Sequence, residues 1–474
     1  MTNVVNVVEL LGQRGFPIAQ SLYGQNILKI DMIKNLKLRH GLKIHWHLLG
    51  ANIAVDLPNV EVCNYDGVSW SNDIYVNYIE RLCKTGERVI VISSFTHEEH
   101  NQVMQVGKNM KKYPNGNLVV VLHCPFEELV RNISKPDGDT TFGGASWQNE
   151  STLGWIKLLS SGLVDKWVAV SRDVLKSFTK ENLEYIGPAD IRVITNGVND
   201  LLYRPIDVCE KQYMKASYGI SGLTVGTTVG FKRVKGDFIL RNILSYYARV
   251  RSEKCPTFLL PVLPGYSGKV MLEEIVKLDI RPLLFAGKLR LYFDASQWSG
   301  VVNVDELNTK YTDVFHTHIA DMKVSDQSIL RNAWIGVLHT PIQRMMDLYL
   351  RPSISEAFGR GAVEAGLSGS ILLVSDRGYM KRYSMSENVI TLGRGLTIVH
   401  KKDSIGAEYL QDSGRAARLF IERISLYMEY DNDNLMKASE QSVALCKENC
   451  PTLEEMLNNW RVLIEDMNDE NTSC

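Results

Sequence analysis

Residues 348–369 read LYLRPSISEAFGRGAVEAGLSG, and the apolar run ILLVS follows at 371–375. This order predicts a buried strand over 348–351, a glycine-containing turn, a helix and a second buried strand. Gly359 and Gly361 let a backbone approach a ligand closely, because glycine has no side chain. The helix after them begins with unpaired N–H groups and the positive end of its dipole, which together favour a phosphate. The stretch therefore predicts a phosphate-binding turn.

Two carboxylates bracket this turn. Glu356 is expected at the carboxyl end of the first strand, where open α/β sheets bind ligands. Glu364 is expected about one turn inside the helix, where it could accept hydrogen bonds from ribose hydroxyls. An ordinary helix with incidental acidic residues would explain the two glutamates alone. Together with the glycines, they predict one site for a sugar, a diphosphate and a ribose.

Strands and helices alternate outward from this unit in both directions. Near-continuous apolar runs are typical of parallel strands covered on both faces, and amphipathic patterns between them predict crossover helices. The predicted strands cover 4–10, 43–49, 88–93, 118–123, 166–170 and 192–195, then 227–231, 257–261, 283–285, 334–338, 348–351 and 371–375. Helical patterns cover 25–39 and 237–250 and follow Asn72, His97 and Ser171. The pattern predicts two doubly wound, Rossmann-like α/β domains.

The chain has 474 residues, which suits two domains of about 200 residues each. The alternation breaks at 203–205, so we predict an N-terminal domain over 1–205 and a C-terminal domain over 206–445. The remaining segment, 446–474, contains a capping box at 452–455 and one apolar helical face that includes Trp460. Two segments fit the alternation poorly: a Pro/Gly-containing loop at 133–155 and an insertion at 292–332.

Composition excludes several classes of protein. The 53 basic and 54 acidic side chains give a net charge of −1, so no general attraction to nucleic acid is expected. The longest apolar runs are strand-sized, and the start of the chain lacks the pattern of a signal peptide. We therefore expect a cytoplasmic protein without a transmembrane segment, whose eight scattered cysteines are free thiols.

The phrase Pro-Ser-x-x-Glu-x-Phe-Gly, with Glu356 and Glu364 separated by seven residues, resembles the signature of a large family of retaining GT-B glycosyltransferases. That family contains sucrose synthases, bacterial glycogen synthases and phosphatidylinositol mannosyltransferases. The phrase Asn196-Gly197-Val198 is similar to the family's sequence at the domain junction. The resemblance runs from about residue 90 to residue 395. It implies two Rossmann-like domains that face each other across a cleft, and a final helix that crosses back to the first domain.

The resemblance also implies donor-binding residues. Phe358, Gly359, Arg360, Gly361 and Glu364 match the motif, with Glu356 beside the reacting sugar. A diphosphate needs cations, and the segment GFKRVKG at 230–236 stands where the family carries an arginine and a Lys-Gly pair. Lys235 matches the lysine. Phe231 occupies the arginine's place, so either Lys232 or Arg233 replaces that arginine, and we favour Arg233 because its planar fork binds two phosphate oxygens.

In the first domain, His123 follows the apolar strand at 118–122, where the family often has a histidine close to the sugar. Taken alone, a histidine at the end of a strand is more often a packed or capping residue. Gly12 and Gly15 occupy the place of the family's glycine-rich first loop, although the segment 21–24 is an alternative. We expect His123 to contribute to catalysis and the two glycines to contact phosphate or acceptor.

No metal site is predicted. His97 and His100 have the wrong spacing for a metalloprotease helix, and the pairs His45/His47 and His316/His318 lack an evident third ligand. Cationic side chains and a helix N-terminus can neutralise a diphosphate, so no metal and no cofactor are required beyond a nucleotide diphosphate sugar as co-substrate.

The resulting hypothesis is a retaining glycosyltransferase, most simply a hexosyltransferase, that moves a sugar from a nucleotide diphosphate donor to an unidentified acceptor. The resemblance implies same-face attack, in which a departing phosphate oxygen takes the acceptor's proton. The substitution at Phe231 leaves open an alternative, a catalytically inactive sugar-nucleotide-binding or scaffold protein of the same fold.

Overall fold

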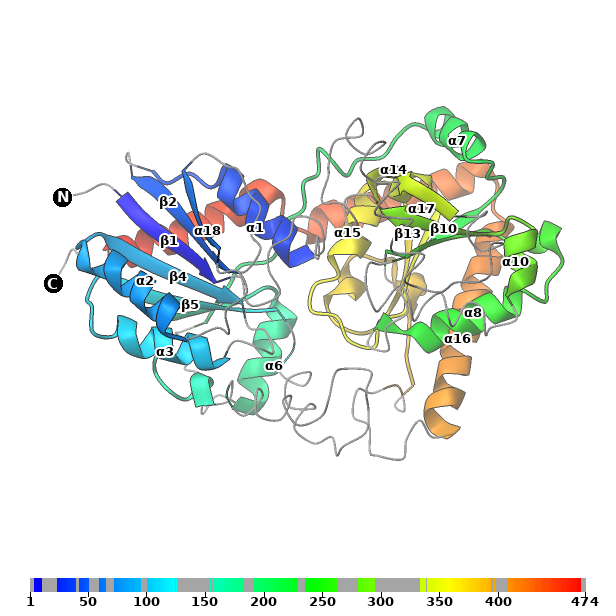
Figure 1. Ribbon diagram of the computed structural model, residues 1–474. Helices are drawn as coiled ribbons and strands as arrows, with labels where there is room; N and C mark the ends of the chain where they lie inside the picture. The colour runs from blue at the N-terminus through cyan, green and yellow to red at the C-terminus, as the bar shows by residue number, and fades with distance from the viewer. Residues whose placement is uncertain are drawn as a thin grey trace. The chain divides into compact units, whose positions relative to one another are not determined.

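In the computed structural model, the chain forms two compact units (Figure 1). Unit 1 comprises Met1–Gly197 and Leu453–Cys474, and unit 2 comprises Val198–Thr452. The structure describes residues 4–10, 24–39, 42–50, 59–64, 72–94, 100–123, 125, 154, 157–182, 191–228, 235–262, 280–294, 333–337, 339–393, 396 and 407–469. Among these residues, no helix is long and apolar enough to cross a membrane.

Unit 1 is built on a seven-stranded sheet in the order β3-β2-β1-β4-β5-β6-β7, and its described strand pairs are all parallel. Its strands are β1 Val4–Leu10, β2 Lys43–Gly50, β3 Val60–Asn64, β4 Arg88–Ser94, β5 Gly116–Leu122, β6 Lys166–Ala169 and β7 Ile191–Val193. Its helices include α1 Gly24–Asn35, α2 Asn72–Lys84, α3 His100–Met110 and α6 Arg172–Asn182. Every residue of β4 is buried, as expected for a parallel strand covered on both faces.

Unit 2 has a second seven-stranded parallel sheet, in the order β11-β10-β9-β8-β12-β13-β14. Its strands are β8 Thr224–Gly226, β9 Thr257–Pro261, β10 Leu289–Asp294, β11 Ala333–Val337, β12 Leu348–Arg351, β13 Ile371–Ser375 and β14 Val389–Ile390. Its helices include α7 Val208–Ser217, α8 Asp237–Tyr247, α10 Arg281–Phe285, α14 His339–Met345, α15 Arg360–Leu367, α16 Ala407–Met428 and α17 Asn432–Asn449. The predicted class, two doubly wound α/β domains, is confirmed.

Alternate residues of the unit 2 strands enter two apolar clusters, because successive strand side chains point to opposite faces. Leu348 and Leu350 pack with residues of α8 and α16 on one face. Tyr349 packs with residues of α14 and α15 on the other. The strand β12 is thus buried from both sides, which explains why its sequence is a near-continuous apolar run.

Three details differ from the sequence-based prediction. The first strand of unit 2 covers Thr224–Gly226 rather than 227–231. The apolar run 283–285 belongs to helix α10, which starts with Pro282 in its first turn, and the strand follows at Leu289–Asp294. The sequence pattern does not predict the edge strands β3 and β14. Short apolar runs fit helices and strands alike, so length and periodicity could not separate them.

The C-terminal helix α18, Leu453–Asp469, belongs to unit 1, as the resemblance implied (red in Figure 1). Its buried face consists of Met456, Trp460, Leu463, Ile464 and Met467. Polar contacts with other residues of unit 1 also hold the helix in place. The backbone N–H of Arg39 donates to Glu465 at 2.6 Å, and Arg192 pairs with Asp466 at 2.8 Å.

Candidate functional site

The two sheets each contain a topological switch point, where the strand order changes direction. In unit 2 it lies between β8 and β12, because the chain builds outward from β8 through β9, β10 and β11 and then returns to β12 on the other side. Ligands of open α/β sheets bind outside the carboxyl ends of the strands at such a point. The segments that leave these two strands are 227–236 and 352–359, which contain most of the predicted donor-binding residues.

Glycines allow these two segments to approach each other. Gly236 and Gly359 are the N-caps of α8 and α15, both in the left-handed conformation with φ of 79°, and neither helix has a side-chain cap. A Cβ on Gly236 would lie 2.0 Å from the Pro352 carbonyl oxygen. A Cβ on Gly361 would lie 2.3 Å from Thr228 Oγ1. The close packing of the two loops therefore requires glycine, and it places two helix N-termini at the switch point.

Glu356 is the centre of a charged cluster between these loops. Lys235 Nζ donates to Glu356 Oε2 at 2.9 Å, and Arg351 donates to the same oxygen through Nε at 3.0 Å and through a second nitrogen. Ser353 Oγ donates to it at 3.3 Å. Within the part of the chain that the structure describes, all of these hydrogen bonds are accepted by Oε2, and Oε1 accepts none of them. The carboxylate is thus held firmly by one oxygen.

The cluster keeps Glu356 ionised. Burial alone would raise the pKa of this carboxyl group, since its side chain is only 11% exposed. The positive charges of Arg351 and Lys235 outweigh burial and lower its pKa to about 2. At neutral pH, Glu356 is therefore an acceptor of hydrogen bonds and not a general acid.

Arg351 is a part of this cluster that sequence reasoning missed. It is the last residue of β12, and its side chain is 8% exposed. The available signal was an arginine at the end of an otherwise apolar strand, a position that is costly unless the charge is paired. Its partner is Glu356, five residues later in the sequence. The two side chains meet only because the chain turns back over the end of the strand.

The loop after β13 closes on the other side of Glu356. Gly378 has a φ of 67°, and a Cβ at this position would lie 1.8 Å from the Glu356 carbonyl oxygen. A side chain at residue 378 would therefore displace the backbone that carries the carboxylate. This second contact, like the ion pairs, holds Glu356 in one position.

The remaining motif residues have different environments. Glu364 is buried in α15 and accepts from Arg360 Nε at 2.6 Å, one turn back in the same helix. Phe358 is 3% exposed and stacks on Tyr379, so its ring belongs to the apolar core of unit 2. The side chain of Phe358 anchors the turn in the apolar core, whereas the backbone at Gly359 and Gly361 forms the turn itself.

Unit 1 brings a second group of polar residues to the ends of its central strands. His123 follows β5, and its Nε2 lies 3.2 Å from Ser94 Oγ at the end of β4. Burial and then the charge of Lys29 lower the pKa of His123 to about 3, so the imidazole is neutral at physiological pH. Lys29 of α1 pairs with the buried Glu9 of β1 at 3.0 Å. Glu9 and Lys29 were not among the predicted site residues.

Some predicted residues lie outside the part of the chain that the structure describes: Arg233 with its alternative Lys232, Phe231, Gly12 and Gly15. The segment 133–155 lies almost wholly outside it as well, and so does 295–332 of the predicted insertion. Predictions about these positions stay predictions.

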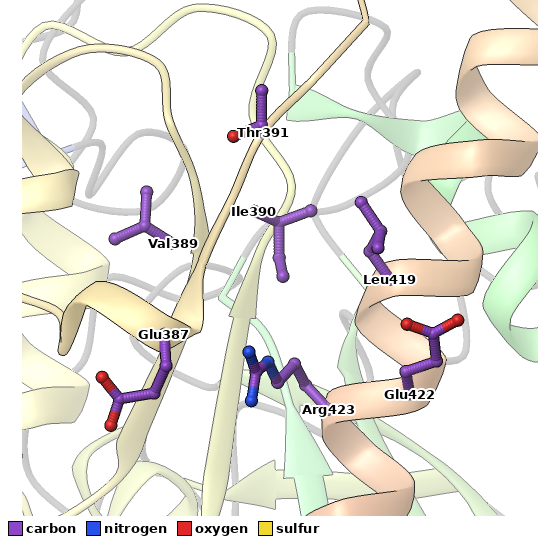
Figure 2. Close-up of a pocket in the computed structure, with 7 residues that line it drawn as sticks. All are labelled: Glu387, Val389, Ile390, Thr391, Leu419, Glu422 and Arg423. Atoms are coloured by element: carbon purple, nitrogen blue, oxygen red, sulfur yellow. The ribbon is translucent and has the colours of Figure 1, made fainter.

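A separate pocket of about 440 Å³ lies at the β14 edge of the unit 2 sheet (Figure 2). Ile390 and Leu419 form its apolar part, and Arg423 extends between Glu387 and Glu422. One strand, β13, lies between β14 and β12. The pocket therefore does not include Glu356 or the glycine-capped helix ends.

No family model matches the sequence, and no curated protein sequence matches it. Solved structures do match its fold. A glycosyltransferase from Rickettsia africae ESF-5 is 14% identical, with a TM-score of 0.57 over 98% of this chain and 99% of that chain. HepE from Anabaena, in complex with UDP and glucose, is 13% identical, with a TM-score of 0.57 over 98% and 100%. Sucrose-phosphate synthase from Thermosynechococcus elongatus is 12% identical, with a TM-score of 0.60 over 98% and 100%. The chain therefore has the two-domain GT-B fold of these glycosyltransferases.

Proposed function

We propose that this chain is a retaining glycosyltransferase that uses a nucleotide diphosphate sugar as donor and needs no metal ion for transfer. The observation that carries the proposal is the cluster of Glu356, Lys235 and Arg351 at the unit 2 switch point, beside the glycine-capped N-termini of α8 and α15. The cluster places a fixed carboxylate, which suits a sugar, next to cations and the positive ends of two helices, which suit a diphosphate.

The leaving diphosphate gains negative charge as the glycosidic bond breaks. Lys235 is 24% exposed, so it can reach a ligand while Arg351 continues to neutralise Glu356. The N-terminus of α15 offers a further positive end, since Gly359 caps it without a side chain. Groups fixed in advance of the reaction stabilise developing charge without having to reorganise. Lys235 and this helix end would therefore stabilise the departing diphosphate.

Glu356 would orient the transferred sugar. Its Oε2 accepts hydrogen bonds from Arg351, Lys235 and Ser353, and its Oε1 would accept a hydrogen bond from a hydroxyl group of the sugar. Because its charge is already paired, Glu356 is a poor covalent nucleophile. We infer that a departing phosphate oxygen takes the acceptor's proton, with attack on the same face of the sugar. The neutral His123 and the pair Glu9–Lys29 of unit 1 would serve the acceptor side.

A panel of nucleotide sugars tests this function, beginning with UDP-glucose because the structurally similar HepE was solved with UDP and glucose. We expect one donor to raise the melting temperature and to be hydrolysed slowly or transferred to a glycan, lipid, protein or small-molecule acceptor. E356Q should abolish turnover, whereas E387Q, which changes an exposed acid in the same unit, should not. Donor binding without turnover in wild type would identify an inactive sugar-nucleotide-binding protein, and no binding by any donor would contradict the proposal.

A further inference from the structure

Three potential metal ligands converge on the outer part of the unit 1 sheet. His45 and His47 lie two residues apart on β2 and therefore on the same face. Glu61 lies on the neighbouring edge strand β3, directly opposite His47 in the register of the two strands. The sequence offered the two histidines without a third ligand, because β3 is not recognisable from its own residues. Strand pairing supplies that ligand.

The distances suit a metal ion. One ligand atom from each of His45, His47 and Glu61 lies within 4.8 Å of the others. His47 Nδ1 and Glu61 Oε2 are 3.4 Å apart. Two ligands bound at about 2.0–2.2 Å to a tetrahedral Zn²⁺ are separated by roughly 3.3–3.6 Å. This pair therefore already has the spacing of two ligands on one ion, and the ligand atom of His45 lies within 4.8 Å of both.

A hydrogen-bond chain determines which nitrogen of His47 is available. Asn6 donates through Nδ2 to Glu87 at 2.9 Å, so the amide oxygen Oδ1 of Asn6 faces His47 Nε2 at 3.0 Å. An amide oxygen only accepts, so His47 must carry its proton on Nε2 and keep a lone pair on Nδ1. Histidines that bind metals commonly donate their second N–H to a carbonyl or carboxylate in this way.

Lone pairs outnumber protons around Nδ1. The Tyr78 hydroxyl donates to His47 Nδ1 at 2.9 Å, and it is also within hydrogen-bonding reach of the Glu61 carboxylate. A single hydroxyl proton cannot be donated to both of these acceptors at once. A bound cation would relieve this excess of acceptors, and Tyr78 could then donate to one of its other neighbours.

We propose that His45, His47 and Glu61 bind a divalent transition-metal ion of the Zn²⁺ type, which joins the edge strand β3 to β2. Two imidazoles and one carboxylate favour such an ion over Ca²⁺ or Mg²⁺, which prefer oxygen ligands. The Glu61 side chain is 51% exposed, so an ion can reach the site from solvent, and water can complete the coordination. The site lies in unit 1 and is independent of the glycosyl transfer proposed for the molecule.

The test uses the full chain after removal of metals with a chelator. Zn²⁺ titrated in competition with a chromogenic chelator should bind in a 1:1 complex, and Co²⁺ should give the intense visible absorption of a tetrahedral site. H45Q and E61Q change partly exposed side chains and should leave the circular dichroism spectrum unaltered. Each should weaken Zn²⁺ binding at least tenfold.

The matched control is H316Q/H318Q, which alters the other histidine pair of the same spacing and should leave Zn²⁺ affinity unchanged. The proposal is overturned if wild type binds no Zn²⁺, or if the H45Q/E61Q double variant binds Zn²⁺ as tightly as wild type does. Either result would leave the donor-binding experiments on unit 2 unaffected, so the two proposals can fail separately.

Discussion

Glu356 has a structural role in addition to the one proposed in catalysis. Arg351 is nearly buried, and its charge is balanced by Glu356. In E356Q the amide keeps the shape and can accept one hydrogen bond, but Arg351 remains buried without a charged partner. Removing one partner of a buried pair costs about 3–5 kcal/mol, and the retained hydrogen bond should make the loss smaller. We therefore expect E356Q to lower the urea midpoint of unit 2 as well as to abolish turnover.

The double variant R351M/E356Q separates the two roles. It removes both charges, so it should recover part of the stability lost in E356Q, since a buried charge no longer lacks its partner. Turnover should stay absent. Equal urea midpoints for wild type and E356Q would show that the ion pair contributes little to folding.

The low pKa of Glu356 predicts a specific dependence of stability on pH. Its ordinary value is 4.5, and in the folded protein it is about 2. A carboxyl group whose pKa is lower in the folded state stabilises the protein above its unfolded value, and this contribution is lost as the pH falls. We expect the stability of wild type to decrease from pH 4.5 toward pH 2 more steeply than that of E356Q. Urea midpoints measured across this range provide the comparison.

E387Q is the matched control for the pH experiment, because Glu387 is an exposed acid of the same unit. Its pH profile should parallel that of wild type. If E356Q and wild type lose stability with the same slope below pH 4.5, Glu356 is not held ionised by Arg351 and Lys235.

The helix α15 depends on glycine where it begins. A methyl group at residue 361 would lie 2.3 Å from Thr228 Oγ1 and 3.0 Å from the Tyr349 hydroxyl, so G361A must separate the loops that follow β8 and β12. We expect the affinity for the nucleotide donor to fall at least tenfold, or about 1.4 kcal/mol. Isothermal titration calorimetry with the donor identified by the panel measures this change.

Gly414 offers a control for the same substitution in another helix. It lies within α16, and a Cβ there would meet no atom within 4 Å. G414A should leave donor affinity unchanged and raise stability by about 0.5–1 kcal/mol, because alanine restricts the unfolded chain and favours the helix. Unchanged donor binding in G361A would show that the loops do not need to meet for the site to form.

The chain returns to its first unit at the C-terminus, where α18 buries one apolar face. Truncation after Cys450 would remove Trp460, which is 5% exposed, and Leu463, which is fully buried. We expect unit 1 to unfold at lower temperature while unit 2 keeps its transition. Differential scanning calorimetry of the truncated chain should then show one transition shifted and the other retained.

Single substitutions refine the truncation experiment. L463A should cost about 2–5 kcal/mol, as is usual for removing a buried leucine. V462A, on the exposed side of the same helix, should change stability by about 0.5 kcal/mol or less. Similar effects of L463A and V462A would contradict the orientation of α18.

Chelation should affect the two units differently. The proposed transfer reaction needs no metal ion, so EDTA should leave the rate of turnover unchanged. The proposed Zn²⁺ site would stabilise unit 1 by binding only its folded form, so EDTA should lower the melting temperature of unit 1. Loss of turnover in EDTA, restored by Mg²⁺ or Mn²⁺, would contradict the metal-independent mechanism.

Much of the architecture could be predicted from local sequence, since each strand of a doubly wound sheet is a short apolar run between turns. The strands Leu348–Arg351 and Ile371–Ser375 have the bounds that their residues predict. Runs without clear boundaries were misplaced, as at 227–231, or were helical, as at 283–285. Helix and strand periods cannot be distinguished over three or four residues.

The class of fold follows from local sequence, and so does the prediction that Glu356, Lys235 and the glycines around them form a site. Which groups these residues contact depends on how distant segments pack together. The pairing of Arg351 with Glu356 depends on a turn back over the end of β12, and that of His47 with Glu61 depends on the register of two strands. Local propensity reflects the structure that a segment favours on its own. Ion pairs and the meeting of metal ligands, in contrast, form between segments that are separate in the sequence. Such contacts leave no periodic signal in the residues that make them.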